Sequence, residues 1–290
     1  MKRLRRTMLF MPGNNPSMLQ SADILGADSI ILDLEDAVSL TEKDSARILV
    51  REAVKNLHYQ GVEVVVRINP LDTEYAMEDI ENIAKVKPDT ILVPKATEEA
   101  MEIVDREVTR IEKEEGFEEG SIRLFALIES AYGVENVYSI IKSSNRIEGI
   151  LFGGEDFTSD MGVKRTKEGD EILYARNKIA TACRALKVDS IDTPFTDTND
   201  FEGLIKDTTK AKNLGFTGKA SINPRQIESI HSVYAPTEAE IKHAERVMEA
   251  KDAALAEALG VFSLDGKMVD LPVINRAKTT LELAKILGLR

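Results

Sequence analysis

Short apolar segments alternate with amphipathic segments from the start of the chain to about residue 235. The apolar segments have the length and the Val, Ile and Leu content of buried strands, and the segments between them carry apolar residues at helical spacing. The expected strands are Thr7–Met11, Ser29–Leu34, Val62–Ile68, Thr90–Pro94, Ile122–Ile128, Gly149–Phe152, Val188–Asp192 and Gly215–Ser221. The expected helices are Pro16–Leu25, Thr41–Asn56, Glu74–Ala84, Thr97–Glu115, Val134–Ser143, Glu171–Leu186, Asp200–Leu214 and Pro224–Tyr234.

This alternation predicts a parallel sheet covered by helices, with a strand starting about every 30 residues. Eight such units most simply close into an α/β fold of the (β/α)8 barrel type over residues 1–235. An open doubly wound sheet is the alternative, but no glycine-rich dinucleotide loop follows the first strand. Thr41 is expected to cap the second helix, because Asp44 follows three residues later.

Residues 236–290 depart from this repeat. They predict a helix from Pro236 to about Leu259, a hairpin of Val261–Leu264 and Lys267–Val269 around Asp265-Gly266, and a helix over Pro272–Leu287. This C-terminal helix–hairpin–helix extension has little to pack on once a barrel has closed. We therefore expect it to pack on a neighbouring subunit; the alternative is that it folds over the bottom of its own barrel.

Composition narrows the class of protein. The net charge of −12 argues against a nucleic-acid partner, and no apolar run approaches the roughly 20 residues that cross a membrane. The apolar stretch behind the basic N-terminus ends at Pro12 and is too short for a signal-peptide core. The single cysteine, Cys183, excludes an internal disulfide and is expected to be a core residue of a cytoplasmic protein.

Ionisable residues follow the predicted strands, where barrel enzymes carry their active sites. Glu129 and Asp156 follow neighbouring strands, so their side chains can converge. Carboxylates that share one barrel mouth repel one another unless a cation neutralises them, and ligands that are all oxygen favour Mg²⁺. The alternative is that one or both merely cap the helices that follow.

Two basic residues have competing interpretations. The guanidinium of Arg67 could grip a substrate carboxylate or form a structural ion pair with Asp33, Glu35 or Asp36. Lys95 could form a Schiff base, as in class I aldolases, but the neighbouring carboxylates favour an ion pair instead.

The turn Gly13-Asn14-Asn15-Pro16 precedes a helix and is a candidate anion site. Arg5, Arg6 and Lys95 could add positive charge there, near the phosphorylated arm of a cofactor. The three histidines, His58, His231 and His243, show no ligand spacing and are expected to have no catalytic part.

The motifs that carry these residues resemble the citrate lyase β-subunit family, whose relatives include malyl-CoA and citramalyl-CoA lyases. The resemblance covers nearly the whole chain. The motifs are Arg6-Thr-Met-Leu-Phe-Met-Pro-Gly-Asn14, Asp33-Leu-Glu-Asp36, Val66-Arg-Ile-Asn69, Ala126-Leu-Ile-Glu-Ser130, Phe152-Gly-Gly-Glu-Asp-Phe157, Gly218-Lys-Ala-Ser-Ile-Asn-Pro-Arg-Gln-Ile227 and Asp265-Gly-Lys-Met-Val-Asp-Leu-Pro-Val-Ile-Asn-Arg-Ala277.

The resemblance implies a Mg²⁺-dependent lyase that cleaves a (3S)-citryl thioester, on an acyl carrier protein or CoA, into oxaloacetate and an acetyl thioester. It also implies a homotrimer or hexamer, with acyl carrier (γ) and transferase (α) subunits as partners. The loop Met161-Gly-Val-Lys-Arg165 varies in the family, so no substrate contact is carried over there.

Roles follow by matching each motif. Glu129 and Asp156 would bind the metal, and Glu129 would also contact substrate. Arg67 would bind substrate, and Glu35 and Asp36 would support the metal's water ligands. Two further roles are assigned to residues outside this group: Asp270, delivered by a neighbouring subunit, is the candidate proton donor, and Asn14 with Lys95 would bind the CoA-like arm.

Three other functions remain open at this point. The chain could be a stand-alone malyl-CoA or citramalyl-CoA lyase, which assays with each CoA ester would reveal. It could be a catalytically silent scaffold subunit, which would bind no Mg²⁺. It could be a Schiff-base aldolase that uses Lys95, which borohydride would trap.

Overall fold

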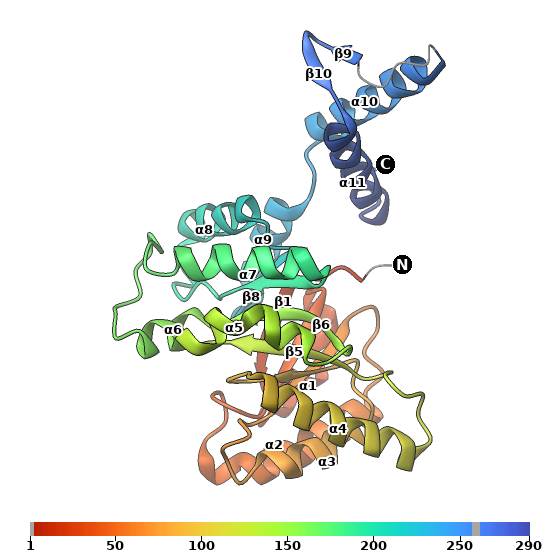
Figure 1. The fold of residues 1–290 in the computed structure, drawn as a ribbon. Helices are drawn as coiled ribbons and strands as arrows, with labels where there is room; N and C mark the ends of the chain where they lie inside the picture. The colour runs from red at the N-terminus through yellow and green to blue at the C-terminus, as the bar shows by residue number, and fades with distance from the viewer. Residues whose placement is uncertain (1–2, 257–261) are drawn as a thin grey trace. The chain divides into compact units, whose positions relative to one another are not determined.

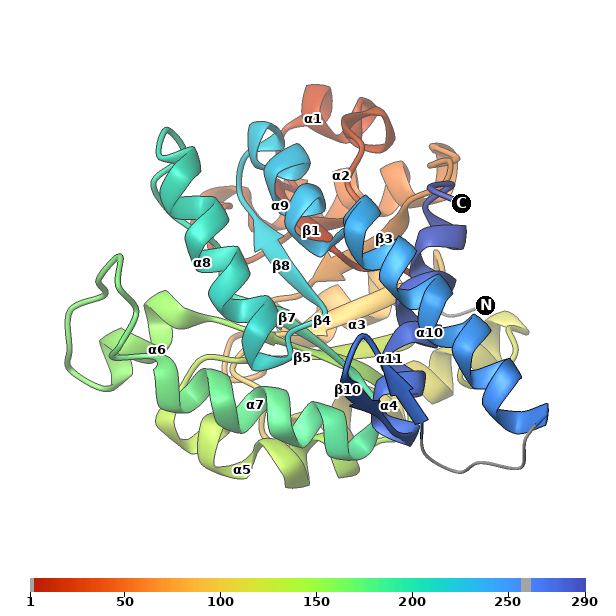
Figure 2. The same ribbon diagram turned by 90° about the horizontal axis from the view of Figure 1, so that it is seen from above.

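The computed structural model describes residues 3–256 and 262–290. In it, eight parallel strands pair in chain order from β1 to β8, and β8 pairs again with β1, so the barrel is closed (Figures 1 and 2). The predicted (β/α)8 barrel is therefore confirmed. The strands are β1 (Thr7–Pro12), β2 (Ser29–Asp33), β3 (Glu63–Arg67), β4 (Thr90–Val93), β5 (Arg123–Ile128), β6 (Ile147–Phe152), β7 (Asp189–Asp192) and β8 (Gly218–Ser221).

Helices cover the outside of the strands, as the view in Figure 2 shows. They are α1 (Pro16–Gln20), α2 (Lys43–Asn56), α3 (Ala76–Ala84), α4 (Glu98–Glu115), α5 (Ala131–Lys142), α6 (Gly154–Asp160), α7 (Leu173–Leu186), α8 (Phe201–Leu214) and α9 (Ile227–Tyr234). Short 3-10 helices occupy Ala22–Leu25, Leu40–Glu42 and Pro224–Gln226.

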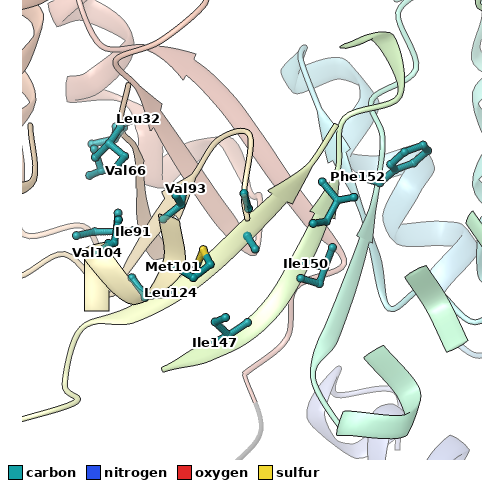
Figure 3. Packing of buried hydrophobic residues seen from close by; sticks show 14 of the residues in the cluster. Leu32, Val66, Ile91, Val93, Met101, Val104, Leu124, Ile147, Ile150 and Phe152 are labelled. Atoms are coloured by element: carbon teal, nitrogen blue, oxygen red, sulfur yellow. The ribbon is translucent and has the colours of Figure 1, made fainter. Parts of the chain in front are cut away.

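Two layers of apolar side chains hold the barrel together. Successive residues of a strand point to opposite faces, so each strand supplies both layers. The layer between strands and helices includes Leu32, Val66 and Ile150 and packs against helix residues such as Val104 of α4 (Figure 3). The layer inside the barrel is formed by Met8, Ile31, Val65, Leu92, Phe125, Leu127, Leu151, Ile191 and Ala220, with Phe10 packed against it. Cys183 is buried in the outer layer, as expected.

Several element boundaries differ from the prediction for identifiable reasons. Thr41 does not cap the second helix, because it lies inside a 3-10 turn and the cap position falls at Glu42. The fifth helix starts earlier than predicted, at Ala131, because the hydroxyl of Ser130 accepts a hydrogen bond from the backbone of Gly133 at 3.0 Å. The helix α6 was not predicted at all. Its seven residues are too few to show a helical period.

The chain divides into two compact units, Met1–His231 and Ser232–Arg290. The second contains α10 (Glu238–Ala256), the antiparallel strands β9 (Phe262–Leu264) and β10 (Lys267–Val269), and α11 (Leu271–Ile286). Its helices pack around a small apolar core that includes Val247 and Ile274. The hairpin turn has positive φ at Asp265 (52°) and Gly266 (74°), as its sequence predicts. The predicted positions Leu259 and Val261 lie outside the described residues, and packing on a neighbouring subunit stays a prediction.

Among the helices of residues 3–256 and 262–290, none combines the length and the apolar character that a membrane span requires.

Candidate active site

Strand alternation brings three charged residues to the C-terminal end of the barrel. In β2, β3 and β5 the last apolar residue that points into the barrel is followed, two positions later, by Asp33, Arg67 and Glu129. Residues two apart along a strand face the same side. The same pattern that fills the barrel with apolar side chains therefore places these three at its mouth.

A cavity of about 360 Å³ opens at this end of the barrel. Its walls combine apolar side chains of the inner layer with carboxylates and one guanidinium. The lining residues are Phe10, Asp33, Asp36, Ala37, Arg67, Leu127, Glu129, Leu151, Gly153, Gly154, Glu155, Asp156, Thr193, Pro194 and Ile222. Glu129, Asp156 and Arg67 thus meet in one cavity, as the sequence predicted.

Arg67 is held by the segment that follows β2. Its Nε and Nη2 donate to the two oxygens of Asp33, both at 2.6 Å, and Nη1 lies 2.9 Å from Oε2 of Glu35 and 3.2 Å from Oδ2 of Asp36. The guanidinium also stacks 4.9 Å from the ring centre of Phe10. Burial opposes the charge, yet Asp33 and its neighbours raise the pKa of Arg67. The two interpretations of Arg67 are compatible, because Asp36 is an exposed partner that a substrate group could replace.

Glu35 is a buried carboxyl with spare hydrogen-bonding capacity. Its Oε2 makes no properly oriented hydrogen bond, although Arg67 is nearby. Burial, together with the charges of Asp36 and Asp33, raises its pKa to about 7 against the opposing effect of Arg67. Its backbone is fixed by the buried Lys43, whose Nζ donates to the carbonyl oxygens of Leu34 and Glu35 at 2.7 and 2.6 Å.

Glu129 is also buried, and its surroundings disfavour a negative charge. Burial and the nearby Glu35 and Asp156 raise its pKa to about 8. Its Oε1 accepts a hydrogen bond of 2.6 Å from the backbone of Lys95, whose φ of 46° turns the chain there. Its Oε2 faces Gly153, where an added Cβ would lie 3.0 Å from that oxygen. The glycine leaves the carboxylate room beside the cavity.

Asp156 comes from the first turn of α6, which follows β6. Its side chain is exposed towards the cavity, while the helix start is buried. The backbone N–H of Gly154, the first residue of α6, donates to Oγ1 of Thr193 at 3.0 Å. Neither α6 nor this contact could be predicted from the sequence.

The residues present fit a magnesium ion. Five carboxyl groups, Asp33, Asp36, Glu129, Glu155 and Asp156, line the cavity with the guanidinium of Arg67, and Glu35 lies beside that guanidinium without lining the cavity. Glu35 and Glu129, the two buried carboxyl groups with raised pKa values, would ionise readily beside a cation. Within the described residues, no three Asp, Glu, His or Cys side chains converge as a ready-made metal cage. Mg²⁺ does not need one, since it is usually bound by one or two carboxylates and keeps several waters.

Two predictions about the phosphorylated arm are wrong. Arg5 and Arg6 precede β1 and therefore lie at the N-terminal end of the barrel, opposite the cavity. Arg5 is buried there against Glu63, at 2.7 Å, and Asp189, at 2.9 Å, and Arg6 pairs with Asp28 at 2.8 Å. Their charges form ion pairs at the N-terminal end of the barrel.

The other two residues predicted to bind the cofactor arm, Asn14 and Lys95, do not line the cavity, and their binding of the arm stays a prediction. Asn14 donates to Oε2 of Glu42 at 2.8 Å, and Asn15 caps α1. Lys95 has an exposed side chain and forms no direct ion pair within the described part of the chain, which corrects that prediction, although its positive charge acts to lower the pKa of Glu35. A Schiff-base lysine needs a desolvated ammonium, so the exposure of Lys95 also weakens the aldolase alternative.

Asp192 does not line the cavity. Asp192 ends β7 but points into the outer layer, where it pairs with Arg176 and Lys219. None of the three histidines lines the cavity. Asp270 belongs to the second unit, where its side chain accepts a hydrogen bond from Val273 and caps α11. Its part in catalysis stays a prediction.

A closed parallel barrel with carboxylates and a paired arginine at the C-terminal ends of its strands is the architecture of a barrel enzyme. A family model described as HpcH/HpaI aldolase/citrate lyase matches residues 6–224. The chain belongs to this family.

Individual relatives agree with this assignment. The citrate lyase subunit beta of Leuconostoc mesenteroides subsp. cremoris is 49% identical over 98% of this chain and 94% of its own length. The human mitochondrial citramalyl-CoA lyase is 29% identical over 97% of this chain and 85% of its own length. The protein CitE of Mycobacterium tuberculosis, crystallised with magnesium, acetoacetate and coenzyme A, has a TM-score of 0.82 at 28% identity and covers 97% of this chain and 98% of that one.

Proposed function

We propose that this chain is the β subunit of a citrate lyase. It would cleave a (3S)-citryl thioester, carried by an acyl carrier protein or by CoA, into oxaloacetate and an acetyl thioester. The observation that carries the proposal is the convergence of Glu129, Asp156 and Arg67 in one cavity of a chain that is 49% identical to a citrate lyase subunit beta.

The reaction breaks the bond between the carbon that bears the hydroxyl and the carbon next to the thioester. The hydroxyl loses its proton and becomes the ketone of oxaloacetate, and the electron pair moves into a thioester enolate. A proton then adds to the enolate carbon and completes the acetyl thioester. The site must therefore bind several negative groups, assist loss of one proton and supply another.

The residues of the cavity can divide these tasks. Glu129 and Asp156 would hold Mg²⁺, and Glu129 would also contact the substrate, while Glu35 and Asp36 would hold water ligands of the metal. When bound, Mg²⁺ would withdraw electron density from the substrate's hydroxyl and carboxylate oxygens. Arg67, held by Asp33, would exchange Asp36 for a substrate oxygen and stabilise developing negative charge. Asp270 of a neighbouring subunit would protonate the enolate.

The partners follow from the same assignment. We propose acyl carrier (γ) and transferase (α) subunits, a homotrimer or hexamer of this chain, and a cytoplasmic location. Asn14 and the exposed ammonium of Lys95 would bind the phosphorylated arm of the thioester.

A lyase assay with citryl-, malyl- and citramalyl-CoA, with Mg²⁺ and with EDTA, tests the proposal. Cleavage of the citryl ester that depends on Mg²⁺ is expected, and Asp156→Ala should abolish it. Preference for the malyl or citramalyl ester would identify a stand-alone CoA lyase instead. Failure to bind Mg²⁺ in calorimetry would indicate a scaffold subunit.

A further inference from the structure

A group of four buried charges lies behind β7 and β8, on the outer face of the barrel wall. Arg176 comes from α7, Asp192 from β7, Asp207 from α8 and Lys219 from β8. Three of these residues are fully buried and Asp207 is 5% exposed. The two cations and two anions cancel, and their contact atoms lie 2.6–2.9 Å apart. Burial opposes ionisation of Asp207, but Lys219 and Arg176 hold its pKa below the usual value.

The ammonium of Lys219 links this group to the segment that follows β7. Its three N–H donors go to Oδ2 of Asp192 at 2.6 Å, Oδ2 of Asp207 at 2.7 Å and the carbonyl oxygen of Thr193 at 2.7 Å. With all three donors used, the ammonium has one orientation. The backbone of Thr193 is thereby fixed relative to two strands and a helix.

Thr193 connects this fixed backbone to the wall of the cavity. It is fully buried, borders the cavity, and accepts the N–H of Gly154 on its Oγ1 at 3.0 Å. A Cβ on Gly154 would lie 2.9 Å from the same oxygen, so the glycine permits this close approach. The first N–H groups of a helix have no partner within the helix. The hydroxyl of Thr193 supplies one at the start of α6, two residues before Asp156.

We propose that Thr193 is a positioning residue for the metal site, anchored by the buried ammonium of Lys219. This inference rests on the proposed role of Asp156 as a metal ligand. Without the hydroxyl, the buried N–H of Gly154 lacks its acceptor, and the first turn of α6 is free to shift. Residues that orient a ligand from behind typically change metal affinity about 10- to 100-fold when they are replaced.

The test compares Thr193→Val, which keeps the shape and removes the hydroxyl, with Thr193→Ser, which keeps the hydroxyl. Thr208→Val is the matched control, because Thr208 is equally buried but its hydroxyl donates to Leu204 of its own helix, at 2.7 Å. Mg²⁺ affinity is measured by calorimetry. Hydrogen exchange of the peptide that covers α6 is measured without metal. The apparent Mg²⁺ constant and kcat are then measured with citryl-CoA.

Thr193→Val should bind Mg²⁺ about 10- to 100-fold more weakly, lose protection in the α6 peptide, and recover kcat when Mg²⁺ is saturating. Thr193→Ser and Thr208→Val should match the unsubstituted protein. Unchanged Mg²⁺ affinity and exchange in Thr193→Val would overturn this inference and leave the proposed function intact. Absence of Mg²⁺ binding by the unsubstituted protein would overturn both.

Discussion

Both oxygens of Asp33 are bonded to the guanidinium of Arg67, and the two nitrogen–oxygen distances are 2.6 Å. Asp33 also accepts the backbone N–H groups of Glu35 and Ala37, at 2.9 and 3.0 Å. One carboxylate therefore orients both the arginine and the loop that carries Glu35. Asp33 is the last residue of β2 and Arg67 the last residue of β3, and both line the cavity.

Arg67→Lys should cut turnover about 100-fold, because a lysine cannot hold both oxygens of Asp33 and still reach the substrate. The free energy of unfolding should fall by roughly 1–3 kcal/mol, since Asp33 is left with an unfilled hydrogen bond in a buried position. Urea unfolding and the lyase assay measure these two effects. The control is Arg51→Lys at a partly exposed pair with Glu52, where a change within about 0.5 kcal/mol is expected. Equal effects of both substitutions would contradict the special role of Arg67.

The raised pKa values of Glu129 and Glu35 predict an unusual pH dependence of stability in the absence of metal. Folding raises the pKa of each from 4.5, to about 8 and about 7. Between those limits the folded chain keeps protons that the unfolded chain has released. Stability from these groups is therefore full below pH 4.5 and is lost as pH rises towards 8, by roughly 1.4 kcal/mol per pH unit and proton.

Glu129→Gln should flatten that decline, because its amide stays neutral and its oxygen can still accept the N–H of Lys95. Urea unfolding in EDTA from about pH 5.5 to 8.5 is measured for the variant and for the unsubstituted protein. The difference between their free energies of unfolding gives the contribution of Glu129. The difference removes the effect of His231, whose pKa is lowered by burial and by Arg6. Mg²⁺ binding should be lost in the variant. Parallel stability curves would show that Glu129 titrates normally.

Gly153→Ala should weaken Mg²⁺ binding about tenfold without unfolding the barrel. The added Cβ would lie 2.8 Å from Cβ of Glu129 and 3.0 Å from its Oε2, so the carboxylate must move. The matched control is Gly149→Ala, four residues earlier, where the new Cβ would lie 2.3 Å from the ring of Phe125 in the barrel interior. That change should lower stability by about 1–3 kcal/mol or more. Calorimetry measures the loss of Mg²⁺ affinity, and thermal unfolding measures the loss of stability. If Gly153→Ala loses as much stability as Gly149→Ala, the prediction is wrong.

Asp270→Asn should leave Mg²⁺ binding and stability unchanged and sharply reduce turnover. Asparagine caps helices as well as aspartate, so α11 keeps its hydrogen bond to the backbone of Val273. An amide cannot protonate the enolate. Mixing this variant with Glu129→Gln subunits should restore part of the activity if Asp270 acts on a neighbouring subunit. Full turnover in the variant would remove Asp270 from the mechanism.

Much of the barrel and of the candidate site could be predicted from local patterns. Alternation with a period of two identifies the strands, and it also places Asp33, Arg67 and Glu129 inward, because each lies two residues beyond a core position of its strand. Arg5 and Arg6 are close to the glycine turn in sequence but not in space, so their proximity along the chain predicts their position wrongly. Both arginines precede β1, and the glycine turn follows it. The six residues of this strand therefore keep the arginines and the turn at opposite ends of the barrel.

The eight-stranded barrel and most of the carboxylates at its mouth follow from the hydrophobic period and the strand direction, which are local properties of the chain. Which groups pair across elements depends instead on tertiary packing. The hydroxyl of Thr193 meets Gly154, and Lys219 meets Asp207, through contacts between segments that no local period relates. Hydrophobic patterning is read within windows of roughly 11–18 residues, whereas these contacts depend on how separate strands and helices pack.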